Sequence, residues 1–179
     1  LPPRLLREIS REIDRLELVL DHLAELEAER NAVSHDAAST DRTAETIRRL
    51  MQFRGIGPET ATILARELFY RDFVNRRAVA GYAGLTPSPY MSGASRRDQG
   101  ISKAGNPLVR TAMIELAWLW LRHQSKSALS HWFHDRVGAT KGRLRRVAIV
   151  ALARKLLVAL WRFVSTGLVP SGAALKTTS

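Results

Sequence analysis

The Gly55-Ile56-Gly57-Pro58 sequence constrains the fold of this chain more than any other feature, because it separates two segments with helical periodicity. Residues 42–53 and the segment that begins at Pro58 both repeat apolar residues at helical spacing: Ile47, Leu50 and Met51, then Ala61, Ile63, Leu64 and Leu68. Glycine allows backbone conformations closed to other residues, and proline suits the first turn of a helix. The pattern predicts a helix-hairpin-helix with Ile56 between the two helices.

A phosphate group is the expected ligand of this turn. The amides at the start of the second helix carry a partial positive charge and lack partners within the helix. We expect Gly55 and Gly57 to admit a nucleic-acid backbone, with Arg54 and Thr60 adding side-chain contacts. Such contacts position a duplex without reading its bases. The alternative is a tight helical hairpin that binds nothing.

The chain carries a formal charge of +11, from 28 Lys and Arg against 17 Asp and Glu. Residues 1–50 hold 8 basic and 11 acidic side chains, whereas residues 51–179 hold 20 and 6. Nucleic acid is favoured as the partner of this basic part over an anionic membrane surface. Because no apolar run reaches the roughly 18 residues of a membrane span, we expect no membrane partner.

The sequence offers little for metal binding. It contains no cysteine, which excludes disulfides, thiolate nucleophiles and cysteine-based zinc sites. His131 and His134 are spaced to share a helix face, but no further histidine or cysteine completes a site. We predict no metal and no cofactor for this chain alone. Leu1 is neither a start methionine nor part of a signal peptide, so we expect a fragment of a longer protein.

Residues 1–40 are predicted to form a coiled-coil linker helix followed by a turn. Apolar residues alternate in steps of three and four between charged ones, as in a coiled-coil seam: Leu6, Ile9, Ile13, Leu16, Leu20 and Leu23. The polar stretch Asn31–Asp41 suggests the turn. This seam predicts a homo-oligomer; the alternatives are an antiparallel pairing with sequence outside this chain and an ordinary amphipathic helix that packs on the core.

A long basic loop or small hairpin is expected around residues 88–102, after a short helix over residues 75–84. Pro87 and Pro89 exclude helix there. The segment up to Asn106 is rich in glycine, and it combines hydroxyls with cations: Ser92, Ser95 and Ser102, then Arg96, Arg97 and Lys103. Long ordered loops in compact domains are often functional. Phosphate is again the expected ligand.

The remaining sequence predicts two long helices. Asn106 is a plausible N-cap for a helix that begins at Pro107, and residues 141–164 form the second. Trp118, Trp120, Trp132 and Trp161 are assigned to the core, with an exposed position as the alternative for Trp132 because its helix is polar. The predicted fold class is all-α, with a helical domain over residues 41–168 and a flexible tail over residues 169–179.

Four blocks in order resemble the C-terminal domain of the IS-one-ten family of transposases, also called DEDD transposases or bridge-RNA-guided recombinases. The blocks are Phe53-Arg54-Gly55-Ile56-Gly57-Pro58, Ala83-Gly84-Leu85-Thr86-Pro87, Ser92-Gly93 and Ile101-Ser102-Lys103-Ala104-Gly105-Asn106, followed by Leu108-Val109-Arg110. The close resemblance covers about residues 45–125. The preceding coiled coil is similar to the linker between the two domains of that family.

The resemblance implies that Ser92 attacks a DNA phosphodiester within a composite active site. In that family a RuvC-like domain supplies four acidic residues that bind Mg²⁺, so Mg²⁺ is expected in the full-length protein. DNA, a guide RNA and a bacterial cytoplasmic location are implied in the same way. Arg96, Arg97, Lys103 and Arg110 become candidate nucleic-acid contacts. The acids after residue 50 are scattered, so this chain alone is expected to be inactive.

Two alternatives remain open from the sequence. Ala94-Ser95 follows Ser92-Gly93 where relatives commonly have Gly-Lys, which makes Ser95 a rival nucleophile and Ser102 a third candidate. The second alternative gives the chain no catalytic role. It would then be a helix-hairpin-helix module for DNA binding and dimerisation, and Ser92 a turn serine.

Overall fold

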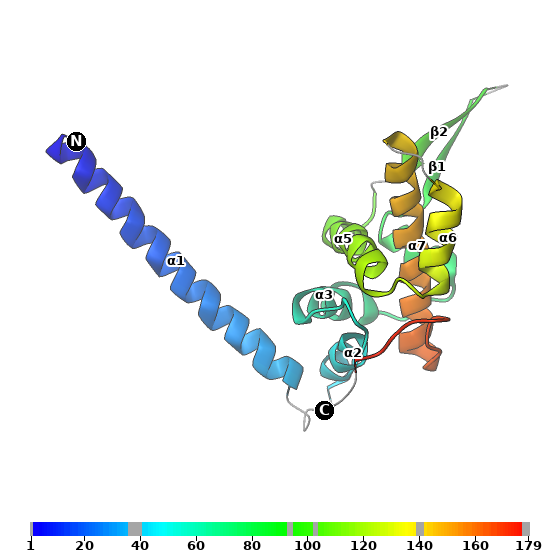
Figure 1. Cartoon of the computed structure of the whole chain (residues 1–179), viewed down its shortest axis with the longest axis horizontal. Helices are drawn as coiled ribbons and strands as arrows, with labels where there is room; N and C mark the ends of the chain where they lie inside the picture. The colour runs from blue at the N-terminus through cyan, green and yellow to red at the C-terminus, as the bar shows by residue number, and fades with distance from the viewer. Residues whose placement is uncertain (1, 36–40, 93–94, 102–103, 139–141, 177–179) are drawn as a thin grey trace. The chain divides into compact units, whose positions relative to one another are not determined.

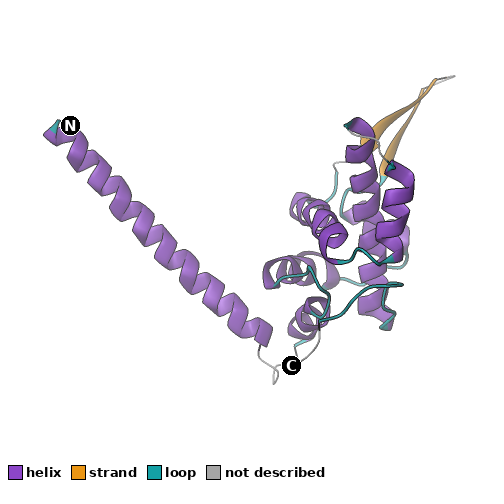
Figure 2. Ribbon diagram, viewed as in Figure 1, coloured by secondary structure: helices purple, strands orange, loops and turns teal. Residues whose placement is uncertain are grey.

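The computed structural model describes residues 2–35, 41–92, 95–101, 104–138 and 142–176, with side chains except at residues 33–35 and 87–100. The chain comprises two compact units, Leu1–Ser39 and Thr40–Ser179. Figure 1 colours both along the chain, and Figure 2 shows that helix dominates each. The all-α fold class is therefore confirmed.

The first unit is the single helix α1, which spans Pro3–His35. All six residues of the expected seam are exposed in it: Leu6, Ile9, Ile13, Leu16, Leu20 and Leu23. The helix runs past Asn31, so the prediction of a turn there is wrong over residues 31–35. No glycine or proline interrupts that stretch, and its alanine favours helix. Residues 36–40 lie outside the described part of the chain.

The second unit begins with α2 (Arg42–Met51), α3 (Pro58–Leu64), the π-helical segment η1 (Ala65–Phe69) and α4 (Arg76–Tyr82). A two-stranded antiparallel hairpin follows, with β1 at Pro87–Ser92 and β2 at Ser95–Ile101. The helices α5 (Pro107–His123), α6 (Ala128–Val137) and α7 (Arg143–Thr166) complete it. None of the described helices combines the length and apolarity that a bilayer crossing needs.

Helix α7 runs through the middle of the second unit and packs against α2, α4, α5 and α6 (Figure 1). Phe53 is fully buried beside it, with ring centroids 4.8 Å from Phe163 and 5.8 Å from Trp120. The guanidinium of Arg49 donates to the carbonyls of Phe163 and Val164 at 2.7 and 2.9 Å. The Phe163 carbonyl also accepts from the Gly167 amide at 2.9 Å, so Arg49 adds a side-chain donor to the end of α7.

The four tryptophans differ in how deeply they are buried. Trp120 is fully buried, whereas Trp132 and Trp161 are half-buried and Trp118 is 39% exposed. Cations cover two of the outer rings: Arg145 lies 5.2 Å from the Trp118 centroid and Lys155 lies 4.7 Å from that of Trp132. The core assignment is therefore wrong for Trp118, which stacks with an arginine at the surface.

The C-terminal tail is bound to the helical unit over residues 171–176, contrary to the prediction that it is flexible. The buried side chain of Gln124 accepts from the Ala174 amide at 2.7 Å and donates to the Ala174 carbonyl at 2.8 Å. The Ala128 amide donates to the Ser171 carbonyl at 3.0 Å. Tertiary hydrogen bonds of this kind hold a segment whose own sequence shows no periodic pattern.

Candidate functional site

The Gly55–Gly57 turn joins α2 to α3, and Ile56 is buried between these helices at 1% exposure. Gly55 has a φ of +90°, and a β-carbon there would lie 3.1 Å from the β-carbon of His123. Gly57 has ordinary extended dihedrals, φ −94° and ψ 172°, and a β-carbon there would meet nothing within 4 Å. A special backbone conformation is therefore confirmed for Gly55 and wrong for Gly57.

Arg54 and Thr60 lie on either side of this turn. Arg54 is exposed, and its backbone is held from both ends: its amide donates to Ala174 at 3.2 Å and its carbonyl accepts from Gln124 at 2.8 Å. Thr60 is half-buried in the first turn of α3. Lys176, which the sequence analysis missed, donates from Nζ to the Ile56 carbonyl at 3.0 Å. The tail thus brings a second cation to the turn.

The hairpin gathers four of the predicted site residues at its far end. Ser92, the last residue of β1, pairs with Ser95, the first residue of β2, and the next pairs inward are Met91 with Arg96 and Tyr90 with Arg97. The side chains of these residues lie outside the described part, as do Ser102 and Lys103 entirely. Arg110, in the first turn of α5, is half-buried.

The base of the hairpin is fixed by the close contact of two glycine-containing segments. A β-carbon on Gly105 would lie 2.2 Å from the Gly84 amide nitrogen and 2.4 Å from the Tyr82 carbonyl oxygen. Gly84 has a φ of +65°. The Asn106 amide donates to the same Tyr82 carbonyl at 2.7 Å. The points where the chain enters β1 and leaves β2 are thereby locked together.

Asn106 joins this base to the helices on both sides. Its Oδ1 accepts from the amides of Leu108 and Val109 at 3.0 and 3.2 Å, so the predicted N-cap is confirmed. Its Nδ2 donates to Glu67 at 2.9 Å. Glu67 lies in the π-helical segment η1, a type of distortion that recurs at functional sites.

A group of aromatic and basic side chains lies next to Asn106. The guanidinium of Arg71 lies 5.1 Å from the Tyr82 ring centroid and 5.8 Å from that of Tyr70. Hydrogen bonding with Tyr70 lowers the pKa of Tyr82, and Asn106 and Arg71 add to that shift; the same contact raises the pKa of Tyr70. No local motif in the sequence indicates this group, because its members come from separate segments of the chain.

The acidic residues that the structure describes do not fit a magnesium site. Within the described residues, no three side chains of Asp, Glu or His lie close enough to share a metal ion. Glu67 is bonded to Asn106, and Asp72 pairs with Arg42 at 2.5 Å. Both the pairing with Arg42 and the charge of that guanidinium lower the pKa of Asp72. Mg²⁺ prefers clustered oxygen ligands that keep several waters.

Comparison with known proteins identifies the part of the chain that holds these features. Residues 47–132 match the family described as Transposase IS116/IS110/IS902 family. The matched segment contains the Gly55–Gly57 turn, the hairpin and its base.

Curated relatives extend this similarity over almost the whole chain. A putative transposase y4rJ of Sinorhizobium fredii is 49% identical over 185 residues, which cover 99% of this chain and 46% of the relative. A probable family 20 transposase of Pseudomonas aeruginosa is 33% identical over a segment that covers 90% of this chain and 45% of the relative. The transposase for insertion sequence element IS1328 of Yersinia enterocolitica is 29% identical over a segment that covers 94% of this chain and 48% of the relative. The chain spans about half the length of these relatives.

Proposed function

Because this chain belongs to the IS116/IS110/IS902 transposase family, as its C-terminal region, we propose that it binds DNA during transposition and supplies the nucleophile Ser92. The observation that carries the proposal is the locked base of the hairpin. Contacts of Gly84, Gly105 and Asn106 hold the base of the hairpin, where β1 starts and β2 ends, on the helical unit. Ser92 lies at the far end of the hairpin. A nucleophile that acts on a bound strand needs such a fixed support.

The proposed reaction is a transesterification at phosphorus. The Ser92 hydroxyl loses its proton to a base, its oxygen bonds to phosphorus, and the bond from phosphorus to one DNA oxygen breaks. That leaving oxygen takes up a proton, and the phosphoserine link keeps the bond energy for rejoining. Cations stabilise the extra negative charge of the transition state, which is the role proposed for Arg96, Arg97 and Lys103.

The Gly55–Gly57 turn is proposed to contact the nucleic-acid backbone. Gly57 leaves open space where a side chain would stand, and Arg54 and Lys176 both lie beside the turn. Thr60 and Arg110 are assigned further phosphate contacts. These contacts would position DNA without selecting its sequence, which we assign to pairing with a guide RNA.

Two further parts of the proposal concern the whole protein. The exposed seam of α1 is proposed to pair with a second copy of the chain, since strand exchange brings several subunits to two duplexes. The Mg²⁺ site is assigned to a RuvC-like domain of the full-length transposase, because no three acids or histidines cluster among the described residues of this chain. We place the protein in the bacterial cytoplasm, where its DNA substrate lies.

A recombination assay with the full-length transposase tests the proposal. Ser92→Ala is expected to reduce recombination at least about a thousandfold, while the affinity of the protein for DNA stays within about twofold. Ser95→Ala is the matched control at the facing position and is expected to keep activity. If Ser92→Ala recombines normally and Ser95→Ala does not, Ser95 is the nucleophile. If neither matters, the chain is a non-catalytic DNA-binding and dimerisation module.

A further inference from the structure

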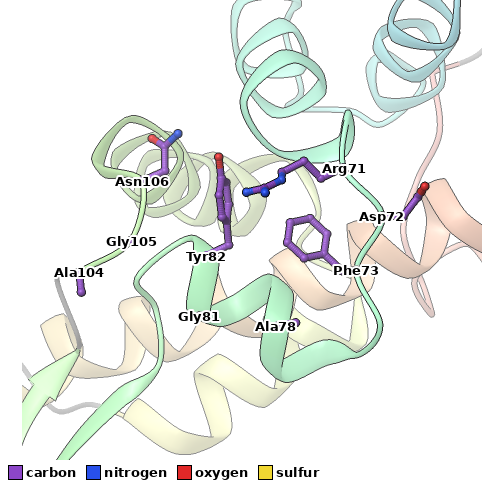
Figure 3. A pocket seen from close by; sticks show the side chains of 9 residues that line it. All are labelled: Arg71, Asp72, Phe73, Ala78, Gly81, Tyr82, Ala104, Gly105 and Asn106. Atoms are coloured by element: carbon purple, nitrogen blue, oxygen red, sulfur yellow. The ribbon is translucent and has the colours of Figure 1, made fainter.

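A pocket of about 490 Å³ opens beside the base of the hairpin (Figure 3). Small residues form part of its lining: Ala78, Gly81, Ala104 and Gly105. Its walls carry the Arg71, Phe73 and Tyr82 side chains, with Asn106 at one edge. Pockets of roughly 300–1,000 Å³ are typical of small-molecule sites. The space is therefore large for a single anion and suitable for a larger group.

One wall is aromatic. The rings of Phe73 and Tyr82 meet at an interplanar angle of 56°, with centroids 5.7 Å apart. Both side chains are half-buried, and they come from the loop before α4 and from its last residue. Figure 3 shows the two rings side by side at the pocket wall. Aromatic faces of this kind stack with nucleobases, whatever the base.

The charge in the pocket comes from Arg71. Its guanidinium is exposed and stacks on Tyr82, and no carboxylate is paired with it among the described residues. The two acids nearby are already bonded: Asp72, which lines the pocket, pairs with Arg42, and Glu67 accepts from Asn106. An anion that enters the pocket would therefore meet one cation whose charge is not offset by a direct partner.

Cation and aromatic wall together fit a nucleotide, which joins a phosphate to a flat base. We propose that this pocket holds one unpaired nucleotide of a nucleic-acid strand, with its phosphate against Arg71 and its base against Tyr82 and Phe73. Base-paired nucleotides are excluded, because both base faces are then stacked within the duplex. This inference rests on the proposed function for the identity of the partner.

The pocket lies at the base of the hairpin that carries Ser92. Tyr82 lies five residues before the start of β1, and Asn106 lies five residues after the end of β2. Asn106 and Tyr82 are joined directly by the 2.7 Å backbone hydrogen bond. A nucleotide bound here is held at the base of the hairpin that carries Ser92. The pocket would thus fix an unpaired strand relative to the nucleophile.

Fluorescence anisotropy with a labelled single-stranded oligonucleotide and the 1–179 chain tests the arginine contact. Arg71→Gln is expected to weaken single-strand binding roughly five- to tenfold and to reduce the slope of log K against log salt by about 0.7. Arg66→Gln, an exposed arginine of η1 outside the pocket, is the matched control and is expected to change affinity less than twofold. Equal effects of the two substitutions would overturn the proposal.

Substitutions at Tyr82 test the stacking contact. Tyr82→Ala is expected to weaken single-strand binding roughly five- to a hundredfold, the range found when stacking aromatics are removed. Tyr82→Phe keeps the ring and is expected to stay within about threefold. Binding to the duplex of the same sequence is expected to be unchanged in both variants. Equal losses for single strand and duplex, or a Phe variant as weak as the Ala variant, would contradict a stacked unpaired base.

Photocrosslinking with a 5-iodouracil oligonucleotide keeps the test decisive if Tyr82→Ala fails to fold. The unsubstituted chain is expected to crosslink within residues 71–82, and crosslinks found only elsewhere would overturn the pocket assignment. Failure of the proposed function looks different, since the unsubstituted chain would then bind neither single-stranded nor duplex DNA. Normal binding that Arg71→Gln and Tyr82→Ala leave unchanged would reject only the pocket.

Discussion

Gly105 lies against Gly84 so closely that a β-carbon on Gly105 would stand 2.2 Å from the Gly84 amide nitrogen. This contact joins two sequence blocks, 83–87 and 101–106, that are separated along the chain by the hairpin. Both blocks lie within the segment that matches the transposase family. Gly84 and Gly105 thus bring the two blocks into contact at the base of the hairpin.

Gly105→Ala is expected to lower the free energy of unfolding by about 2–3 kcal/mol, because backbone atoms on the other side cannot move aside as a flexible side chain would. Chemical denaturation measures this. Gly81→Ala is the matched control: a β-carbon there meets nothing within 4 Å, and Gly81 lies in helix α4. It is expected to stabilise the chain by about 0.5 kcal/mol. A Gly105→Ala variant as stable as the unsubstituted chain would show that the two segments are not in contact.

Gln124→Ala is expected to release the C-terminal tail and to cost about 2–4 kcal/mol of unfolding free energy, because it leaves the carbonyls of Arg54 and Ala174 without their donor. Hydrogen exchange should then rise at the Ala174 and Lys176 amides. Gln52→Ala is the control, since Gln52 is exposed and contributes its backbone carbonyl to the tail. It is expected to change stability by less than about 0.5 kcal/mol. Equal costs for the two would contradict the assignment.

Ile13→Asp is expected to disrupt self-association of the 1–179 chain, because it puts a charge in the middle of the α1 seam. Leu18→Asp provides the control: Leu18 is as exposed as the seam residues, at 55%, but helical periodicity places it on the opposite face. Analytical ultracentrifugation distinguishes the two. If the unsubstituted chain is a monomer, the seam does not pair with a second copy, and sequence outside this chain becomes its expected partner.

Local signals in the sequence predicted the local parts of this structure. Asn106 followed by Pro107 predicted a helix start, and the structure shows Asn106 capping α5. The same holds for the turn at Gly55, because both its flanks have helical periodicity. These features depend on neighbouring residues, so a single sequence contains the information that they require.

The parts that could not be predicted depend on distant partners. Gln124 bonds residues that lie 70 positions before it and 50 positions after it, and nothing in its neighbourhood indicates either contact. Arg71 follows η1 and Tyr82 ends α4, and no local pattern in the sequence indicates that these two side chains meet. For Gly57 the prediction of a special backbone conformation was wrong. Glycine permits such a conformation, but residue 57 adopts an ordinary extended one.

The most direct test of the central claim is to trap the covalent link between protein and DNA. Full-length transposase, Mg²⁺, guide RNA and end-labelled DNA are incubated, resolved in a denaturing gel, and the labelled peptide is sequenced by mass spectrometry. We predict a phosphoserine at Ser92 that is absent from the Ser92→Ala protein. An adduct that persists in Ser92→Ala, or active recombination without any adduct, would contradict it.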